Sequence, residues 1–188
     1  MKYRSVLLFG APGSGKGTQG RVVGGIPGFF YVSTGDMFRA LRQDDPIGRV
    51  FFDYSSRGLL VPDETTVELW TRHMQTSIAE DRFHPERDVL VLDGFPRSLA
   101  QAQMLKDNLE VKAVLYLTCA DTKVLVERLQ KRANIEKRPD DARLEVIQQR
   151  LETYERQTKP VLDFYGSPLI RPIECHQKPV CVLRDVVQ

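Results

Sequence analysis

Apolar and polar residues follow two patterns along the chain, one typical of strands and the other of helices. Short strand-like runs cover residues 6–9, 29–32, 89–92, 113–117 and 168–174. Between them apolar residues recur at helical spacing, and one such stripe, which we expect to be buried in the core, comprises Val67, Trp70, Met74 and Ile78. Asp36 and Asp121 each precede a helical stretch, which we expect them to cap. Alternating strands and helices predict an α/β fold: a doubly wound five-stranded parallel sheet with helices on both faces.

Composition and charge argue against several classes of protein. With 41% hydrophobic and 28% charged residues, the chain of 188 residues is expected to form a single globular domain. A net charge of +2 at pH 7 is too small to indicate a nucleic-acid partner. Its apolar runs are too short for a membrane span and no signal peptide is evident, so we expect a cytoplasmic protein. The three cysteines lack metal-ligand spacing, and we expect them to be small apolar or incidental residues.

The first predicted strand runs into a glycine-rich turn, residues 10–19 with the sequence GAPGSGKGTQ. Glycine allows positive φ and close approach of a ligand, and successive N–H groups at a helix N-terminus form a nest for an anion. Lys16 can reach the outer phosphates of a nucleotide. The threonine stands one position later than in the general phosphate-loop pattern, because Gly17 follows Lys16. The alternative is an ordinary glycine-rich turn between a strand and a helix.

Basic residues gather in the segments that this topology brings to the carboxyl ends of the strands, where ligands bind in such sheets. Arginine suits phosphate oxygens, and six are candidates: Arg39, Arg97, Arg128, Arg132, Arg138 and Arg150. No nucleophile–base arrangement accompanies them. A phosphate acceptor is already anionic and needs no base, so catalysis reduces to alignment, charge neutralisation and exclusion of water.

One carboxylate is expected beside the glycine-rich turn. Asp93 ends a strand predicted to be buried on both faces, where phosphate-loop proteins place a carboxylate for Mg²⁺. The alternative for Asp93 is a role in capping a helix. We expect Asp93 to bind Mg²⁺, directly or through water.

These motifs together resemble the adenylate kinase family of nucleoside monophosphate kinases, in order and over nearly the whole chain. Besides the phosphate loop, the matching segments are STGD at 33–36 with Arg39, GLLVPDE at 58–64, DGFPR at 93–97, and RPDD at 138–141. The resemblance implies a phosphotransferase with a phosphate acceptor, catalysing ATP + AMP ⇌ 2 ADP with Mg²⁺. Its partners would be ATP, AMP and ADP, and the family's habit implies a monomer that binds neither nucleic acid nor membrane.

The resemblance also assigns roles to residues. Those implied to bind ATP are Gly13, Ser14, Gly15, Lys16, Gly17, Thr18, Arg128, Arg132 and, through its main-chain carbonyl, Lys178. Those implied to bind AMP or the transferred phosphate are Thr34, Arg39, Leu60, Val61, Gly94, Arg97, Gln101, Arg138 and Arg150. The catalytic set would be Lys16, Arg97, Arg132, Arg138 and Arg150.

By the same resemblance the domain divides into a core and two segments that close over the substrates. The core would comprise residues 1–32, 63–131 and 142–188, with an AMP-binding segment at 33–62 and a short lid at 132–141. Only five residues separate Arg132 from Arg138, so the four-cysteine zinc insert of long lids is absent. The spacing from Asp141 to Arg150 is one residue longer than usual, and His176 stands where the family commonly has glycine.

Three alternatives remain open at this point. A UMP/CMP kinase of the same superfamily tends to have alanine in place of Thr34 and asparagine in place of Gln101, and to lack the aspartate found here as Asp63. A GTP-binding switch would need an Asn-Lys-x-Asp motif, which does not occur in the sequence. A non-catalytic phosphate-loop binding module is the third alternative.

Overall fold

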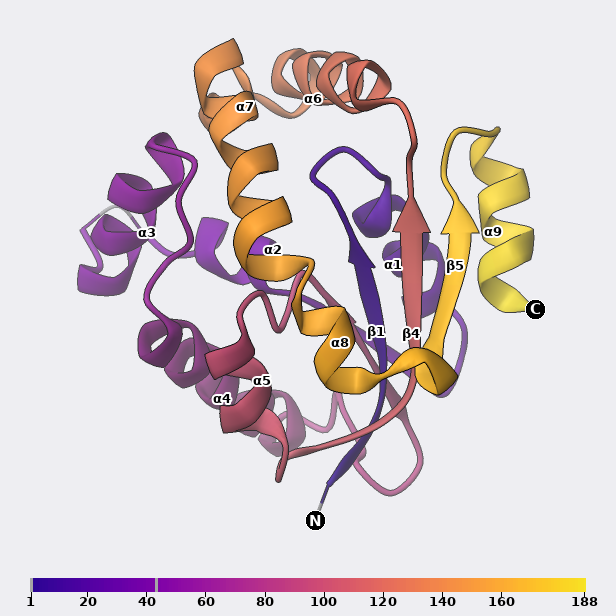
Figure 1. Ribbon diagram of the computed structural model, residues 1–188. Coiled ribbons are helices and arrows are strands. Elements are labelled where there is room, and N and C mark those ends of the chain that lie inside the picture. The colour runs from indigo at the N-terminus through magenta and orange to yellow at the C-terminus, as the bar shows by residue number, and fades with distance from the viewer. Residues whose placement is uncertain (1, 43) are drawn as a thin grey trace.

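The computed structural model describes residues 2–42 and 44–188 (Figure 1). Five strands form one sheet: β1 (Tyr3–Gly10), β2 (Phe29–Ser33), β3 (Val89–Asp93), β4 (Leu109–Thr118) and β5 (Ile170–Glu174). Their order is β2-β3-β1-β4-β5, and every neighbouring pair is parallel. The predicted five-stranded parallel sheet is confirmed. β4 begins four residues earlier than the apolar run from residue 113, because Tyr3 to Ser5 of β1 pair with Leu109 to Val111.

Helices cover both faces of the sheet, as predicted. Successive strand residues point to opposite faces, so Leu7 and Leu8 enter two different cores. The Leu7 core contains side chains from α4 (Asp63–Ala79), α5 (Leu99–Leu105) and α8 (Val161–Tyr165). The Leu8 core contains side chains from α1 (Lys16–Gly24), α6 (Thr122–Glu136) and α9 (Pro179–Val187). Figure 1 shows α5 and α8 in front of the sheet and α9 beside β5.

Most of the remaining helices lie near the carboxyl edge of the sheet. They are α2 (Thr34–Arg39), α3 (Pro46–Ser56), α7 (Leu144–Thr153), a π-helical turn (Tyr154–Thr158), and a 3-10 turn at Pro139–Asp141. A second 3-10 turn, Ser167–Leu169, leads into β5 at the amino edge. The first half of the predicted lid is helical, because α6 continues to Glu136. No helix in the described part of the chain is long and apolar enough to cross a membrane.

Two sequence predictions at helix positions were wrong. The cap of α2 is Ser33, whose hydroxyl accepts from the N–H of Asp36, while Asp36 itself pairs with arginines. In the α4 stripe, Trp70 and Met74 are buried, but Ile78 is 37% exposed because it lies in the last turn, at the edge of the core. The predicted cap Asp121 is confirmed, since its carboxylate accepts from the N–H of Lys123.

Candidate active site

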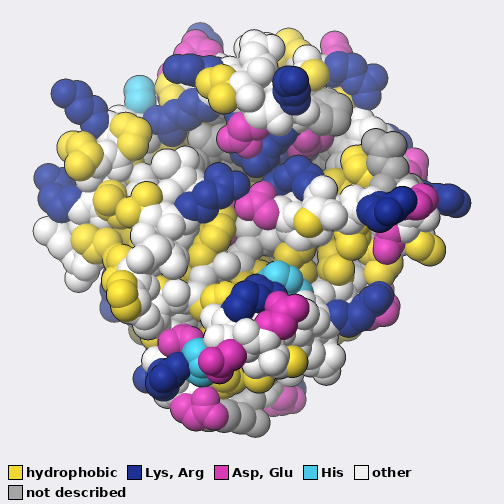
Figure 2. Space-filling model, turned by 180° about the vertical axis from the view of Figure 1, so that it is seen from behind, with side chains coloured by type: hydrophobic (Ala, Val, Ile, Leu, Met, Phe, Trp, Pro, Cys, Tyr) yellow, Lys and Arg dark blue, Asp and Glu magenta, His cyan; other side chains and the backbone are white. Residues whose placement is uncertain are grey.

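A cavity of about 460 Å³ lies at the carboxyl ends of the strands. Its walls include Gly10 at the end of β1, Ser33 at the end of β2, and Asp93 at the end of β3. The face seen in Figure 2 is hollowed near its middle, and basic and acidic side chains gather around the hollow. Every site residue predicted from the sequence lines this cavity except Lys178.

The glycine-rich turn has the geometry of an anion nest. Gly13 and Gly15 have φ of 85° and 97°, conformations that glycine adopts without strain. At Gly13 a Cβ would approach the carbonyl oxygen of Leu125 to 2.7 Å, whereas at Gly15 it would meet no atom of the described residues within 4 Å. The N–H groups of Gly15, Lys16 and Gly17 donate to no acceptor in the part of the chain that the structure describes. Three donors at the N-terminus of α1 thus remain for an anion.

Lys16 lies across this loop. Its Nζ donates to the carbonyl oxygens of Gly10 at 2.7 Å and Ala11 at 3.0 Å. Burial lowers the pKa of Lys16 to about 8, opposed by the negative charge of Asp93 and reinforced by nearby arginines. A phosphate group would replace the two carbonyls as the partner of the ammonium group and would favour its charged form.

A buried carboxylate joins two of the predicted catalytic arginines. Asp141 is 0% exposed; it accepts from Arg132 Nε at 2.7 Å and also pairs with Arg150. Arg150 Nη1 makes a second ion pair with Asp140 at 2.7 Å. The longer spacing from Asp141 to Arg150 therefore does not remove Arg150 from the cavity, since α7 brings its guanidinium back to the RPDD segment.

The predicted AMP side is built from the loops after β2 and β3. Arg39 pairs with Asp36 at 2.6 Å, and Arg97 Nε donates to the carbonyl of Gly94 at 2.7 Å. Burial and the nearby Arg150 lower the pKa of Arg97, yet guanidinium remains charged at neutral pH. Gln101 is buried; its Oε1 accepts from the N–H of Arg97, and its Nε2 donates to Asp63. This glutamine therefore holds the DGFPR loop in place as well as lining the cavity.

The other predicted residues are held as follows. Thr34 Oγ1 donates to the carbonyl of Gly94 at 2.8 Å, linking the ends of β2 and β3. Arg138 pairs with Glu136 at 2.6 Å, and Arg128 Nη2 donates to the carbonyl of Cys175 at 2.9 Å. The carbonyl of Lys178, implied to meet the adenine of ATP, accepts from two N–H groups in the first turn of α9.

Asp93 has the surroundings expected of a Mg²⁺ ligand. It is 9% exposed, and its Oδ2 accepts from the phenol of Tyr31 at 2.8 Å. Its Oδ1 accepts no hydrogen bond from any residue in the described ranges, and Asp93 lines the cavity next to the phosphate loop. Mg²⁺ prefers carboxylate and phosphate oxygens, so this oxygen fits the ion.

Tyr31 is a site residue that sequence reasoning missed. Burial and the charge of Asp93 raise its pKa, so the phenol stays protonated and donates to the carboxylate. Its ring packs against α1 at Gly20 and Gly24, where a Cβ would overlap Tyr31. A signal was present: Gly17, Gly20 and Gly24 lie at helical spacing, which indicates a face that a bulky side chain approaches closely.

Replacing Gly20 with alanine should destabilise the protein. The new methyl group would overlap the ring of Tyr31 and Cδ1 of Leu8. Overpacking costs about 1–3 kcal/mol, and this exceeds the roughly 1 kcal/mol that alanine gains over glycine in a helix. We expect a net fall of about 1 kcal/mol in the free energy of unfolding, measured by urea denaturation.

Gly25→Ala is the matched control. Gly25 has φ of −82°, and a Cβ there would meet only backbone oxygens of the same helix, the nearest at 3.4 Å. The free energy of unfolding of Gly25→Ala should stay within about 0.5 kcal/mol of the parent's. A Gly20→Ala variant as stable as Gly25→Ala would show that Tyr31 does not restrict this face.

The chain was also compared with known proteins. The sequence model of the adenylate kinase family matches residues 8–169. An adenylate kinase from Cyanothece sp. is 42% identical over 168 residues, which cover 86% of this chain and 82% of that protein. An adenylate kinase from Thermobifida fusca is 40% identical, over 85% of this chain and 83% of that protein. One from Parabacteroides distasonis is 37% identical, over 86% of this chain and 83% of that protein. The chain therefore belongs to the adenylate kinase family.

Proposed function

We propose that this protein transfers a phosphoryl group reversibly from ATP to AMP, giving two ADP. The observation that carries the proposal is the composition of one cavity. A phosphate loop with three N–H groups that donate to no acceptor among the described residues forms one part of it, and arginines from α2, the β3 loop, α6, the RPDD segment and α7 line much of the rest. Such a cavity suits two polyphosphate groups that meet end to end. Membership of the adenylate kinase family supports the same reaction.

Each group of residues would have its own part in the reaction. The amides of the loop and Lys16 would hold the donor phosphates, while Arg39 and Arg97 would hold the acceptor phosphate. The acceptor oxygen is already anionic, so the chain need supply no base; the arginines neutralise charge and align the two phosphates. Carboxylates of the chain itself pair with four of these arginines: Asp141 with Arg132 and Arg150, Asp36 with Arg39, and Glu136 with Arg138. Substrate phosphates would replace the carboxylates as partners of these arginines. The lid at 132–141 and the segment at 33–62 would then close over the substrates and exclude water.

Mg²⁺ is the ion that this site would take, with Asp93 holding it directly or through water. When bound, it would neutralise charge on the donor phosphates. Tyr31 would orient the carboxylate through its hydrogen bond to Oδ2.

The choice of AMP over other monophosphates is tested by one coupled assay. ADP formation from ATP and Mg²⁺ should be much faster with AMP than with UMP or CMP at equal concentration. Thr34 and Gln101 support the preference for AMP, because UMP/CMP kinases tend to have alanine and asparagine at these positions. A preference for UMP or CMP would replace the assignment by a pyrimidine monophosphate kinase, and no ADP with any acceptor would favour a binding module.

The lowered pKa of Lys16 leads to an expected pH dependence. With a pKa of about 8, Lys16 is largely neutral above that pH in the free protein, and it must regain a proton when it binds phosphate. ATP binding should therefore take up a fraction of a proton, about half near pH 8, and affinity should fall as the pH rises further. Calorimetry in two buffers of different ionisation enthalpy measures this uptake. Equal uptake by Lys16→Met and the parent protein would contradict the assignment to Lys16.

We also propose that the protein acts as a monomer in the cytoplasm. The habit of its family supports a monomer. The mass in solution, measured by light scattering with and without nucleotides, tests whether the protein is a monomer.

A further inference from the structure

Three potential metal ligands meet at the ends of β4 and β5, outside the phosphate site. Cys119 directly follows β4, Glu174 ends β5, and Cys175 follows it. One sulfur or oxygen atom from each of the three lies within 4.8 Å of the other two. The parallel pairing of Thr118 with Glu174, continued by a hydrogen bond of 2.8 Å from Cys175 N to Thr118 O, holds them together. The sequence spacing of the cysteines gave no indication of this group.

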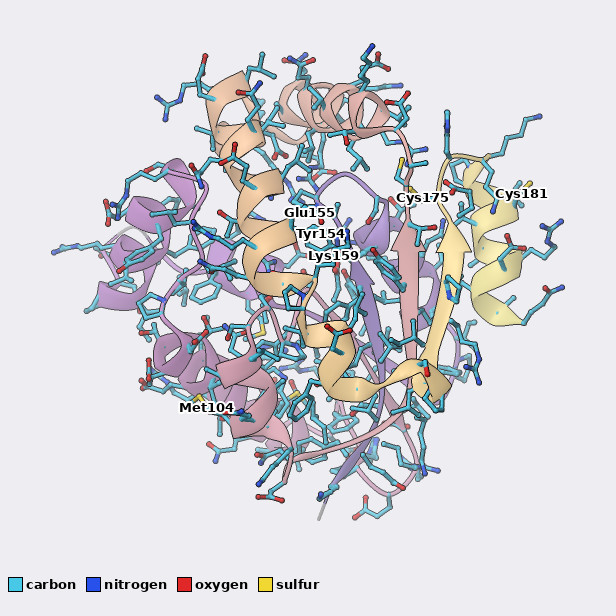
Figure 3. All side chains as sticks on the ribbon, viewed as in Figure 1. Met104, Tyr154, Glu155, Lys159, Cys175 and Cys181 are labelled. Carbon is cyan, nitrogen blue, oxygen red and sulfur yellow. The ribbon has the colours of Figure 1, made fainter. Side chains whose placement is uncertain are left out.

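The group is reachable from solvent. Cys119 is partly buried and Glu174 is exposed, while Cys175 is 1% exposed. Cys119 and Glu174 line a second cavity of about 570 Å³, and Cys175 lines the substrate cavity. Figure 3 shows Cys175 at the end of β5, whereas Cys181 lies on α9. An ion could therefore enter from the second cavity without passing through the nucleotide site.

Two neighbours of the group favour a metal site. Two thiolates and a carboxylate around a divalent ion carry a net charge of −1, and Arg128 Nη1 lies 3.6 Å from Cys175 Sγ to balance it. Glu174 Oε1 accepts from the N–H of His176 at 2.7 Å, which orients the carboxylate. Zinc–ligand bonds of about 2.0–2.3 Å place the ligand atoms of a tetrahedron about 3.5 Å apart, within reach of the observed arrangement.

We propose that Cys119, Glu174 and Cys175 bind a thiophilic divalent metal ion such as Zn²⁺, with water completing a tetrahedron. Binding forms two metal–sulfur bonds and one metal–oxygen bond, and the two thiol protons pass to solvent. The metal would link the ends of β4 and β5 next to Arg128, at the edge of the substrate cavity. It is separate from the Mg²⁺ expected at Asp93, because thiolates select softer ions.

Cobalt titration of the reduced, nucleotide-free protein tests the proposal. Co²⁺ substitutes for Zn²⁺ and gives thiolate charge-transfer absorption and tetrahedral ligand-field bands, so the spectrum reports the ligands without any enzyme assay. We expect one Co²⁺ per chain, displaced by one Zn²⁺. Cys119→Ser and Cys175→Ser should each lose most of the charge-transfer band, and Glu174→Gln should weaken binding by about tenfold or more.

Cys181→Ser is the matched control and should bind like the parent, because Cys181 lies on α9 and is not part of the group. Circular dichroism would verify that each variant folds. If Cys175→Ser does not fold, Cys119→Ser decides, because Cys119 is only partly buried. Absence of a thiolate band at excess Co²⁺ would overturn the proposal, and so would a band that Cys119→Ser leaves unchanged.

Discussion

Replacing Lys16 with methionine should lower kcat/KM for ADP formation by about 10²- to 10³-fold, the loss typical of removing one charge-stabilising donor. Methionine keeps about the length of the aliphatic part of the lysine side chain and lacks its ammonium group. Lys16 Nζ donates hydrogen bonds to the carbonyls of Gly10 and Ala11, so its ammonium group lies within the phosphate loop. The measurement is a coupled assay with ATP, AMP and Mg²⁺ at saturating and limiting ATP.

The control is Lys106→Met, which removes an exposed lysine after α5, away from the cavity. It should keep the parent's activity within about twofold, as expected for a surface position. Full activity in Lys16→Met would remove Lys16 from the catalytic set and with it the central part of the proposed mechanism. A change in KM alone would leave Lys16 as a binding residue that does not act in the transition state.

Asp141→Asn should give the largest loss of stability among single substitutions in the lid. Asp141 is 0% exposed and pairs with both Arg132 and Arg150, so asparagine would leave two nearby cations without their shared anion. Breaking a buried ion pair costs about 3–5 kcal/mol, and we expect about 3 because the arginines keep some contact with solvent. Urea denaturation followed by circular dichroism measures the free energy of unfolding.

Glu155→Gln provides the comparison, because Glu155 pairs with Lys159 at 2.6 Å on the surface. Exposed pairs contribute little, so its free energy of unfolding should change by less than about 1 kcal/mol. Equal effects of Asp141→Asn and Glu155→Gln would mean that the two arginines rearrange and find solvent when Asp141 is neutralised. In that case Asp141 would not hold Arg132 and Arg150 in place.

Local patterns determined the architecture and most of the lining of the site. The order of strands and helices followed from apolar runs and helical stripes, because each element buries a face that its own residues define. The loop around Lys16 was predictable because its function depends on contiguous residues: glycines for positive φ, and a helix N-terminus for the anion. Arg97 and Arg132 could be placed at the cavity because parallel strands bring their carboxyl ends to one edge.

Contacts between distant segments were decided only by the tertiary structure. Tyr31 reaches Asp93 across 62 residues, and Asp141 compensates Arg132 and Arg150 from two different helices. Cys119 and Cys175 meet because β4 and β5 are neighbours in a particular register, which no spacing in the sequence reveals. Ser33 caps α2 because the helix begins at Thr34, which places Asp36 within the first turn, where its carboxylate pairs with Arg39. The sequence by itself determined the helices, the strands and the phosphate loop, because each of these depends on interactions between residues that are close in the chain. Only the tertiary structure decided which charged side chains and metal ligands meet, because those contacts depend on the packing of one element against another.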